Sequence, residues 1–137
     1  MATMLLEIVT PEGVSFSSQV DEVLLPGTEG ELGILPMHAP LITTIVPGEL
    51  VVRSGGKTSY LAVGDGFAEI DQRHVAVLTD MAVEEDDIDE DAVQKAMDKA
   101  QKSLEEADKV DAEQSAMLQA AIQKSMVQLR MKRRRRS

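Results

Sequence analysis

The distribution of proline and glycine divides this chain into two parts. All five prolines lie at or before Pro47 and all nine glycines at or before Gly66, in a chain of 137 residues. Proline fixes φ and removes a backbone donor, whereas glycine permits backbone angles that are closed to other residues. The first part is therefore expected to be rich in turns. The second part, dominated after Ile88 by Ala, Lys, Glu, Gln, Asp and Met, is expected to be helical.

Short apolar runs between the turn residues predict strands in the first part. They cover residues 4–9, 20–25, 32–35, 41–46, 49–53, 58–63, 67–70, 75–79 and 81–84. Short strands at near-regular spacing favour an antiparallel β-sandwich or barrel. We expect this domain to occupy residues 1–86.

Two apolar stripes at helical spacing predict an antiparallel two-helix hairpin over residues 87–137. The first stripe contains Val93, Met97, Ala100, Leu104 and Ala107, and the second contains Leu118, Ile122, Ser125 or Met126, and Leu129. Between them, Asp111 followed three residues later by Gln114 resembles a helix N-cap. A tight turn is expected near residues 108–111. One continuous helix is the alternative.

Several kinds of function are not supported by the sequence. There is no cysteine, and neither His38 nor His74 has a metal ligand at suitable spacing. No nucleophile elbow, zincin helix or dinucleotide fingerprint occurs. We therefore predict no catalytic residues, no metal and no cofactor, and hence no enzyme.

The charge is distributed unevenly along the chain. Up to Asp87, three basic residues stand against fifteen acidic ones, whereas the end of the chain carries the cluster Lys132-Arg133-Arg134-Arg135-Arg136. The acidic part would repel nucleic acid and anionic lipid, and no apolar run is long enough for a membrane helix. We expect neither nucleic-acid binding nor direct membrane insertion. The basic cluster is either a solvated helix end or a docking site for an acidic surface.

The stretch from Gly30 to Gly48 contains three prolines and three glycines among apolar residues. It includes one acidic side chain, Glu31, and one histidine, His38. Turn residues in this density predict a rigid sheet that presents a recognition loop.

This stretch also carries a family resemblance. Gly30-Glu31-Leu32-Gly33-Ile34-Leu35-Pro36, followed by His38-Ala39-Pro40-Leu41 and Pro47-Gly48, resembles the signature of the epsilon subunit of F-type ATP synthases. Residues 66–70 and 75–78 are similar to later strands of the same domain. The resemblance covers about the first 85 residues, and the helical part has the family's length and position.

The resemblance implies a non-catalytic rotor subunit of a proton-translocating ATP synthase. Its sandwich would bind the gamma subunit and the ring of c subunits, with the ring contact made by Glu29, Gly30, Glu31 and His38. Its hairpin would extend along gamma into the catalytic head, which the alpha and beta subunits form. There its basic residues would face an acidic loop of the beta subunit and inhibit ATP hydrolysis. The matching basic positions are Lys124, Arg130, Lys132, Arg133, Arg134, Arg135 and Arg136. The location implied is peripheral, on the cytoplasmic face of the inner membrane.

One motif of the family is incomplete here. Some members bind ATP through Ile/Leu-Asp-x-x-Arg-Ala at the start of the first helix. Ile88 and Asp89 match this motif, but Ala92 replaces its arginine and Asp91 adds an acid. We therefore expect no nucleotide-binding residues.

Two other functions remain open on the residues alone. The chain could be a stand-alone regulator that docks its basic tail on an acidic partner, or a small-molecule sensor built on the hairpin.

Overall fold

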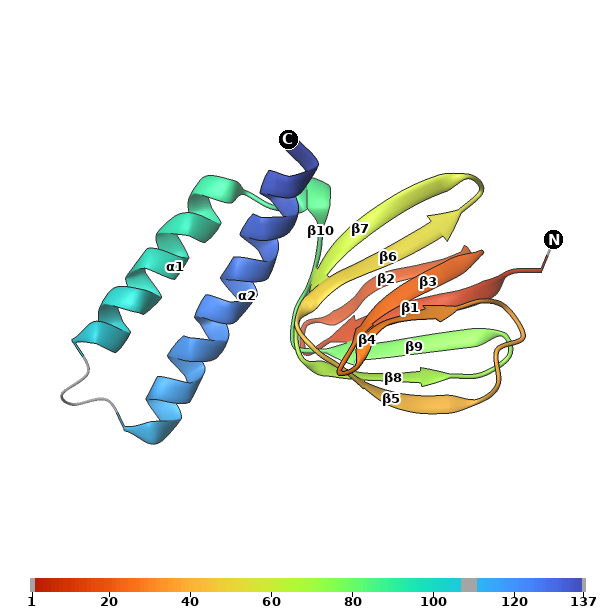
Figure 1. Cartoon of the computed structure of the whole chain (residues 1–137), viewed down its shortest axis with the longest axis horizontal. Helices are drawn as coiled ribbons and strands as arrows, with labels where there is room; N and C mark the ends of the chain where they lie inside the picture. Colours follow the sequence, from red (N-terminus) through yellow and green to blue (C-terminus); the bar gives the residue numbers. More distant parts are fainter. Residues whose placement is uncertain (1, 107–110, 137) are drawn as a thin grey trace.

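The computed structural model of the chain describes residues 2–106 and 111–136, without the side chain of Arg136. In this part of the chain, ten strands are followed by a short 3₁₀ helix and two α-helices (Figure 1). Their bounds are β1 Met4–Thr10, β2 Gly13–Val20, β3 Glu22–Gly27, β4 Gly30–Ile34, β5 Leu41–Ile45, β6 Gly48–Ser54, β7 Lys57–Val63, β8 Gly66–Ile70, β9 His74–Thr79, β10 Ala82–Glu84, η1 Glu85–Asp87, α1 Glu90–Glu105 and α2 Ala112–Arg136. The predicted class, a β-sandwich followed by a two-helix hairpin, is confirmed.

The strands form two layers. They follow one hydrogen-bonded path, β10-β7-β6-β3-β5-β8-β9-β1-β2, and β4 pairs with the free side of β3. Because β3 and β5 are joined only at Gly27 and Ile45, the path folds over at this point. The first sheet thus contains β10, β7, β6, β3 and β4, and the second contains β5, β8, β9, β1 and β2 (Figure 1). All pairs are antiparallel except β1 with β9.

Alternate residues of both sheets fill the space between the layers. In β7, for example, Leu61 and Val63 face this core, while Tyr60 and Ala62 face outward toward α2. The core contains Met4, Leu6, Ile8, Val20, Val23, Leu25, Ile34, Ile45, Leu50, Val52, Leu61, Val63, Ala68, Ile70, Val75 and Val77. These side chains are almost fully removed from water, so their burial is the main force that holds the two sheets together.

One strand was not predicted from the sequence. We expected a single strand over residues 20–25, but β2 ends at Val20 and β3 begins at Glu22. Asp21 lies between them and accepts a hydrogen bond from the Gly55 N–H at 2.8 Å. β2 is rich in serine and mostly exposed, and it is an edge strand held by its ladder to β1. Its sequence therefore lacks the apolar content by which the other strands were recognised.

The helical part agrees with the hairpin prediction, and the alternative of one continuous helix is wrong. α2 begins after Asp111, whose carboxylate accepts the Gln114 N–H at 2.8 Å, as the N-cap prediction required. Ser125 is buried and Met126 is exposed, so Ser125 is the member of the second stripe. The predicted turn near residues 108–111 lies mostly outside the described residues.

In the described ranges, no helix combines the length and the apolar content that crossing a membrane requires.

The close approach of β8 to β9 leads to a first prediction. A Cβ at Gly66 would overlap the carbonyl oxygen of Leu78 and lie 2.8 Å from Thr79 Cα. Because these are backbone atoms of the paired strand, Gly66→Ala should lower the free energy of unfolding by at least about 2 kcal/mol, as overpacking does in other cores. Urea denaturation followed by circular dichroism measures this change.

Gly33→Ala is the control. A Cβ there would meet only Leu24 Cδ2 at 3.4 Å, so a loss below about 1 kcal/mol is expected. Equal losses in the two variants would contradict the argument.

Candidate functional site

Three of the predicted ring-contact residues lie together at the tip of the β3–β4 hairpin. Pro26 pairs with Glu31 and Gly27 with Gly30, so Thr28 and Glu29 form the exposed turn. A Cβ at Gly27 would lie 2.8 Å from the Gly30 carbonyl oxygen, and Gly30 has φ +114°. The turn therefore depends on both glycines, and it holds the carboxylates of Glu29 and Glu31 in solvent.

His38 lies elsewhere. It follows the other end of β4, which is about 13 Å long at roughly 3.3 Å per residue. Its loop is fixed by the Met37 N–H, which donates to the Gln72 carbonyl at 2.7 Å, and by the contact of His38 Nδ1 with the Ala39 carbonyl at 2.7 Å. The structure thus brings together Glu29, Gly30 and Glu31, but it does not place His38 beside them.

The predicted inhibitory cations are mostly engaged within this chain. Lys132 Nζ donates to the Glu85 carbonyl at 3.1 Å. Arg133 donates to Glu90 at 3.2 Å and to Gln94 at 2.7 Å, which ties α2 to α1. Arg134 and Arg135 both form ion pairs with Glu49 of β6. Arg130 is exposed and forms no ion pair with any described residue, and the side chain of Arg136 lies outside the description.

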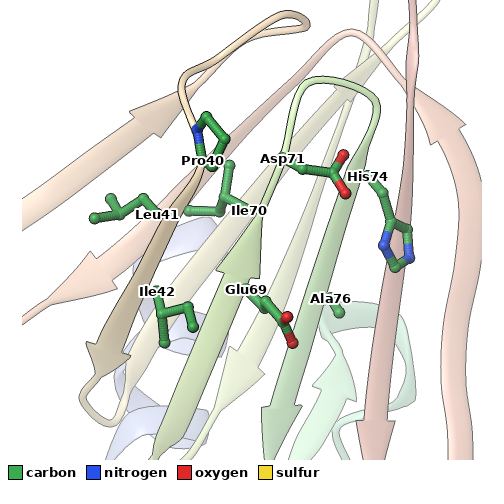
Figure 2. A pocket seen from close by; sticks show the side chains of 8 residues that line it. All are labelled: Pro40, Leu41, Ile42, Glu69, Ile70, Asp71, His74 and Ala76. Carbon is green, nitrogen blue, oxygen red and sulfur yellow. The ribbon is translucent and has the colours of Figure 1, made fainter.

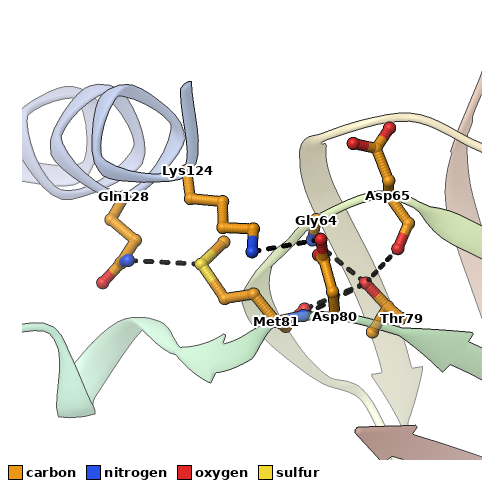
Figure 3. A network of polar contacts seen from close by, with 7 residues as sticks. All are labelled: Gly64, Asp65, Thr79, Asp80, Met81, Lys124 and Gln128. Atoms are coloured by element: carbon orange, nitrogen blue, oxygen red, sulfur yellow. Dashed lines mark hydrogen bonds and ion pairs between the residues drawn. The ribbon is translucent and has the colours of Figure 1, made fainter. Parts of the chain in front are cut away.

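Lys124 attaches the middle of α2 to the turn between β9 and β10 (Figure 3). Its Nζ lies 3.0 Å from Asp80 Oδ2, and Gln128 Nε2 donates to Met81 Sδ at 3.3 Å. The turn itself is fixed by the buried Thr79 hydroxyl, which accepts the Gly64 N–H at 3.2 Å. This hydroxyl also lies 3.1 Å from the Asp65 and Met81 carbonyl oxygens, to one of which it donates.

The residues that match the nucleotide motif have structural roles here. Ile88 is buried against Val127 and Met131 of α2. The Asp89 carboxylate caps α1 by accepting the Ala92 N–H at 3.1 Å. Ala92 is exposed, and no guanidinium occupies its place. The start of α1 thus serves to attach the hairpin to the sandwich.

A further surface was missed in the sequence: a row of apolar side chains on the outer face of the second sheet. Strand register places Phe67 beside Leu78, Leu78 beside Val9, and Val9 beside Val14. Val14 is 63% exposed, Phe67 45% and Leu78 37%, and Ile42, on the neighbouring row, is 70% exposed. We call Val9, Val14, Ile42, Phe67 and Leu78 the outer apolar row. The signal in the sequence was that β8 and β9 each carry a large apolar residue, Phe67 and Leu78, on the face that does not belong to the core.

A shallow hollow of about 530 Å³ adjoins this row (Figure 2). Apolar and acidic side chains line the hollow: Pro40, Leu41, Ile42, Glu69, Ile70, Asp71, His74 and Ala76. Nε2 of His74 lies 2.6 Å from Glu7 Oε1. In the described part of the chain, no three His, Cys, Asp or Glu residues are grouped so that they could hold a metal ion.

The altered nucleotide motif gives a prediction. Without the guanidinium at residue 92, bound ATP would lose a charge-assisted hydrogen bond worth about 1.5–3 kcal/mol. We expect isothermal titration calorimetry to show no micromolar binding of ATP by the isolated chain. Ala92→Arg should bind ATP at least about tenfold more tightly than the unchanged chain. Micromolar affinity of the unchanged chain would contradict this prediction.

Comparison with known proteins places these features in a family. The family model described as "ATP synthase, Delta/Epsilon chain, beta-sandwich domain" matches residues 3–85. The ATP synthase epsilon chain of Nitratidesulfovibrio vulgaris (strain DP4) is 41% identical over 128 residues, which cover 93% of each chain. That of Dehalococcoides mccartyi (strain BAV1) is 40% identical over 137 residues, 99% of this chain and 96% of the relative.

Solved structures share the fold at lower identity. A chain in the Euglena gracilis mitochondrial ATP synthase, in a structure of OSCP, F1 and c-ring, superposes with a TM-score of 0.73 at 23% identity and covers 96% of this chain and 81% of that one. A chain from the Tetrahymena thermophila mitochondrial ATP synthase central stalk and c-ring gives 0.56 at 10% identity, covering 94% and 96%. With the family model over the sandwich and epsilon chains of 40% identity over nearly the whole length, the chain belongs to the ATP synthase epsilon-chain family.

Proposed function

We propose that this chain is the non-catalytic epsilon subunit in the central stalk of a proton-translocating ATP synthase, where it couples rotation of the c-ring to the catalytic head through gamma. Membership of the epsilon-chain family supports this role over the full length of the chain. The solved structures of the same fold belong to assemblies whose descriptions name F1, a c-ring and a central stalk.

The observation that carries the proposal is the outer apolar row. It extends over β5, β8, β9, β1 and β2 on the face of the sandwich that neither helix covers (Figure 1). Contiguous exposed apolar side chains of this kind mark interaction sites in soluble proteins. Gamma is the partner that must stay attached throughout rotation, and we assign this face to it. The acidic residues Glu7 and Glu69 beside the row would then fix the orientation of the contact.

The tip of the β3–β4 hairpin suits the contact with the c-ring. Glu29 lies in the two-residue turn and Glu31 on the adjoining strand β4, both are exposed, and Gly27 and Gly30 hold the turn in one conformation. A rigid polar tip of this kind would meet polar loops of the ring by several weak contacts. His38, at the other end of β4, would make a separate contact.

The hairpin is proposed to regulate ATP hydrolysis. In the arrangement described here, Lys124 and Lys132–Arg135 face the sandwich or α1, so this is the non-inhibiting state. After extension along gamma, the same cations and Arg130 would face the acidic loop of the beta subunit in the head.

The proposed location follows from the ring. A subunit bound to the c-ring lies at the membrane without entering it, and no helix in the described ranges is able to span one. We place the chain on the cytoplasmic face of the inner membrane as a peripheral subunit. The alternative of a stand-alone regulator or small-molecule sensor is not favoured, because epsilon chains align over as much as 99% of the chain.

Substitution in the outer apolar row tests the proposal. Phe67→Ser with Leu78→Ser removes two exposed apolar side chains without changing the core. If gamma binds this face, its affinity for the chain should fall at least tenfold, since removing hot-spot side chains at the centre of an interface costs about 2 kcal/mol or more. Co-purification with gamma and with membranes measures the loss.

Met117→Ser is the matched control, because Met117 is also exposed but lies on α2. It should bind gamma normally. Full retention of gamma by the double variant would refute the assignment of this face.

Truncation after Glu85 tests the regulatory part in the assembled complex. The sandwich should still support coupled ATP synthesis, because β10 ends at Glu84. ATP hydrolysis should rise, since the inhibitory cations are absent. Unchanged hydrolysis would show that the hairpin does not inhibit this enzyme.

A further inference from the structure

The basic end of α2 is neutralised by acidic residues of this same chain. We call Lys132, Arg133, Arg134 and Arg135 the basic latch. Their partners come from three other elements: Glu49 from β6, Glu85 from η1, and Glu90 with Gln94 from α1. On sequence alone this basic segment is either a solvated helix end or a docking site. In the structure the basic latch is docked on acidic residues of its own chain.

Glu49 is the centre of this contact. Its side chain is only 16% exposed, and its carboxylate forms ion pairs with both Arg134 and Arg135. It stands next to Leu50, which is fully buried in the core, so the backbone at Glu49 is held by the sandwich. In register, Glu49 lies beside Ala62, the β7 residue that packs under α2. The carboxylate is thus presented on a rigid surface at the place where α2 ends.

Arg135 is held on three sides. Its guanidinium lies 3.4 Å from the centroid of the Tyr60 ring, a cation–π geometry. The Nη2 of Arg135 donates a hydrogen bond to Glu49 Oε1, and Glu85 Oε2 lies 3.5 Å from the Nε of Arg135. This buried Nε has no hydrogen-bond partner among the described residues, so Glu85 acts on it as a nearby charge. A guanidinium placed in this way is costly to leave unpaired if Glu49 is removed.

The apolar contact between hairpin and sandwich is small. It consists of Val127 and Met131 of α2 against Ala62 and Ile88, with Tyr60, Met81, Val83 and Val93 at its border. These few side chains bury much less apolar area than the sandwich core does. The docked position of α2 therefore depends on its charged contacts as well as on this apolar contact.

We propose that Glu49, together with Tyr60 and Glu85, is an internal mimic of an acidic partner: it binds the basic latch, holds the hairpin on the sandwich, and withholds these cations from any acidic segment outside. Opening of the hairpin and binding of an acidic peptide by the latch are then coupled, each favouring the other. The inference concerns the isolated chain and does not depend on its assembly into the stalk.

Spin labels on the full-length chain test the proposal. The chain has no cysteine, so Lys57→Cys at the start of β7 and Ala116→Cys near the start of α2 give two unique label positions, both exposed. Double electron–electron resonance then measures the distance between sandwich and hairpin. Glu49→Gln is compared with the unchanged chain at low and high salt.

We expect Glu49→Gln to raise the ratio of open to docked molecules about 10- to 100-fold, the range for lost hydrogen bonds between charged groups. High salt should raise the open fraction of the unchanged chain, because salt screens ion pairs. The same salt should raise the open fraction less in Glu49→Gln, which has already lost the ion pairs of Glu49. A short polyglutamate peptide should bind Glu49→Gln more tightly than the unchanged chain. Loss of a merely structural residue would not increase the affinity for an acidic peptide.

Glu22→Gln is the matched control, because Glu22 pairs with Arg53 at 2.5 Å on the surface of the sandwich, between β3 and β6, and forms no ion pair with the hairpin. It should leave the distance distribution unchanged. Arg134→Gln with Arg135→Gln breaks the same contact from the helix side, where the sandwich fold is not at risk, and should also open the hairpin. Distances that stay docked in both latch variants would overturn the proposal, as would equal peptide affinity of Glu49→Gln and the unchanged chain.

Discussion

The parallel pairing of β1 with β9 is the constraint on which the rest of the structure depends. It joins Leu5 to His74 and Val9 to Leu78, residues about half the chain apart. Closing so long a loop costs conformational entropy that only the completed core offsets, so this pairing is expected late in folding. β10, η1 and α1 follow directly after β9, and their positions are defined only when β9 is in place. The outer apolar row also arises from this pairing, because it sets Leu78 beside Val9.

The attachment of the hairpin follows a different physical rule from the sandwich itself. The two sheets are held by close-packed aliphatic side chains, which no change of salt would release. α2 is held by a small apolar patch, by Lys124 on Asp80, and by the arginines on Glu49. Exposed ion pairs are worth little, but Glu49 is mostly buried and Arg135 is stacked on Tyr60, so these contacts are less screened than surface pairs. We therefore expect the sandwich to stay folded under conditions that release the hairpin.

The sequence was sufficient for those features that depend on local chemistry. Turn residues and apolar runs located nine of the strands, and Asp111 with Gln114 marked the start of α2. The motif at Gly30–Gly48 was specific enough to identify the family. β2 was missed because an edge strand is stabilised by pairing with β1, which needs no apolar residues.

Features that depend on which elements meet could not be predicted. In the sequence, Glu49 is an ordinary acidic residue near the start of a strand. Its partner Arg135 is 86 residues away, so no local pattern joins the two. Val127 and Met131 form a second apolar face of α2, which has meaning only once η1 and β7 lie beneath it. His38 is close to Glu31 in the sequence, yet the rest of β4 and the loop that follows it separate the two residues. The hairpin and the outer apolar row lie on different faces of the sandwich: α2 packs on part of the outer side of the first sheet, at Tyr60, Ala62 and Glu49, and the outer apolar row lies on the second sheet. A gamma subunit bound to the second sheet would not displace α2 from the first. The hairpin could then open and close within an assembled stalk, because the residues proposed to transmit rotation and the residues that hold the hairpin do not overlap.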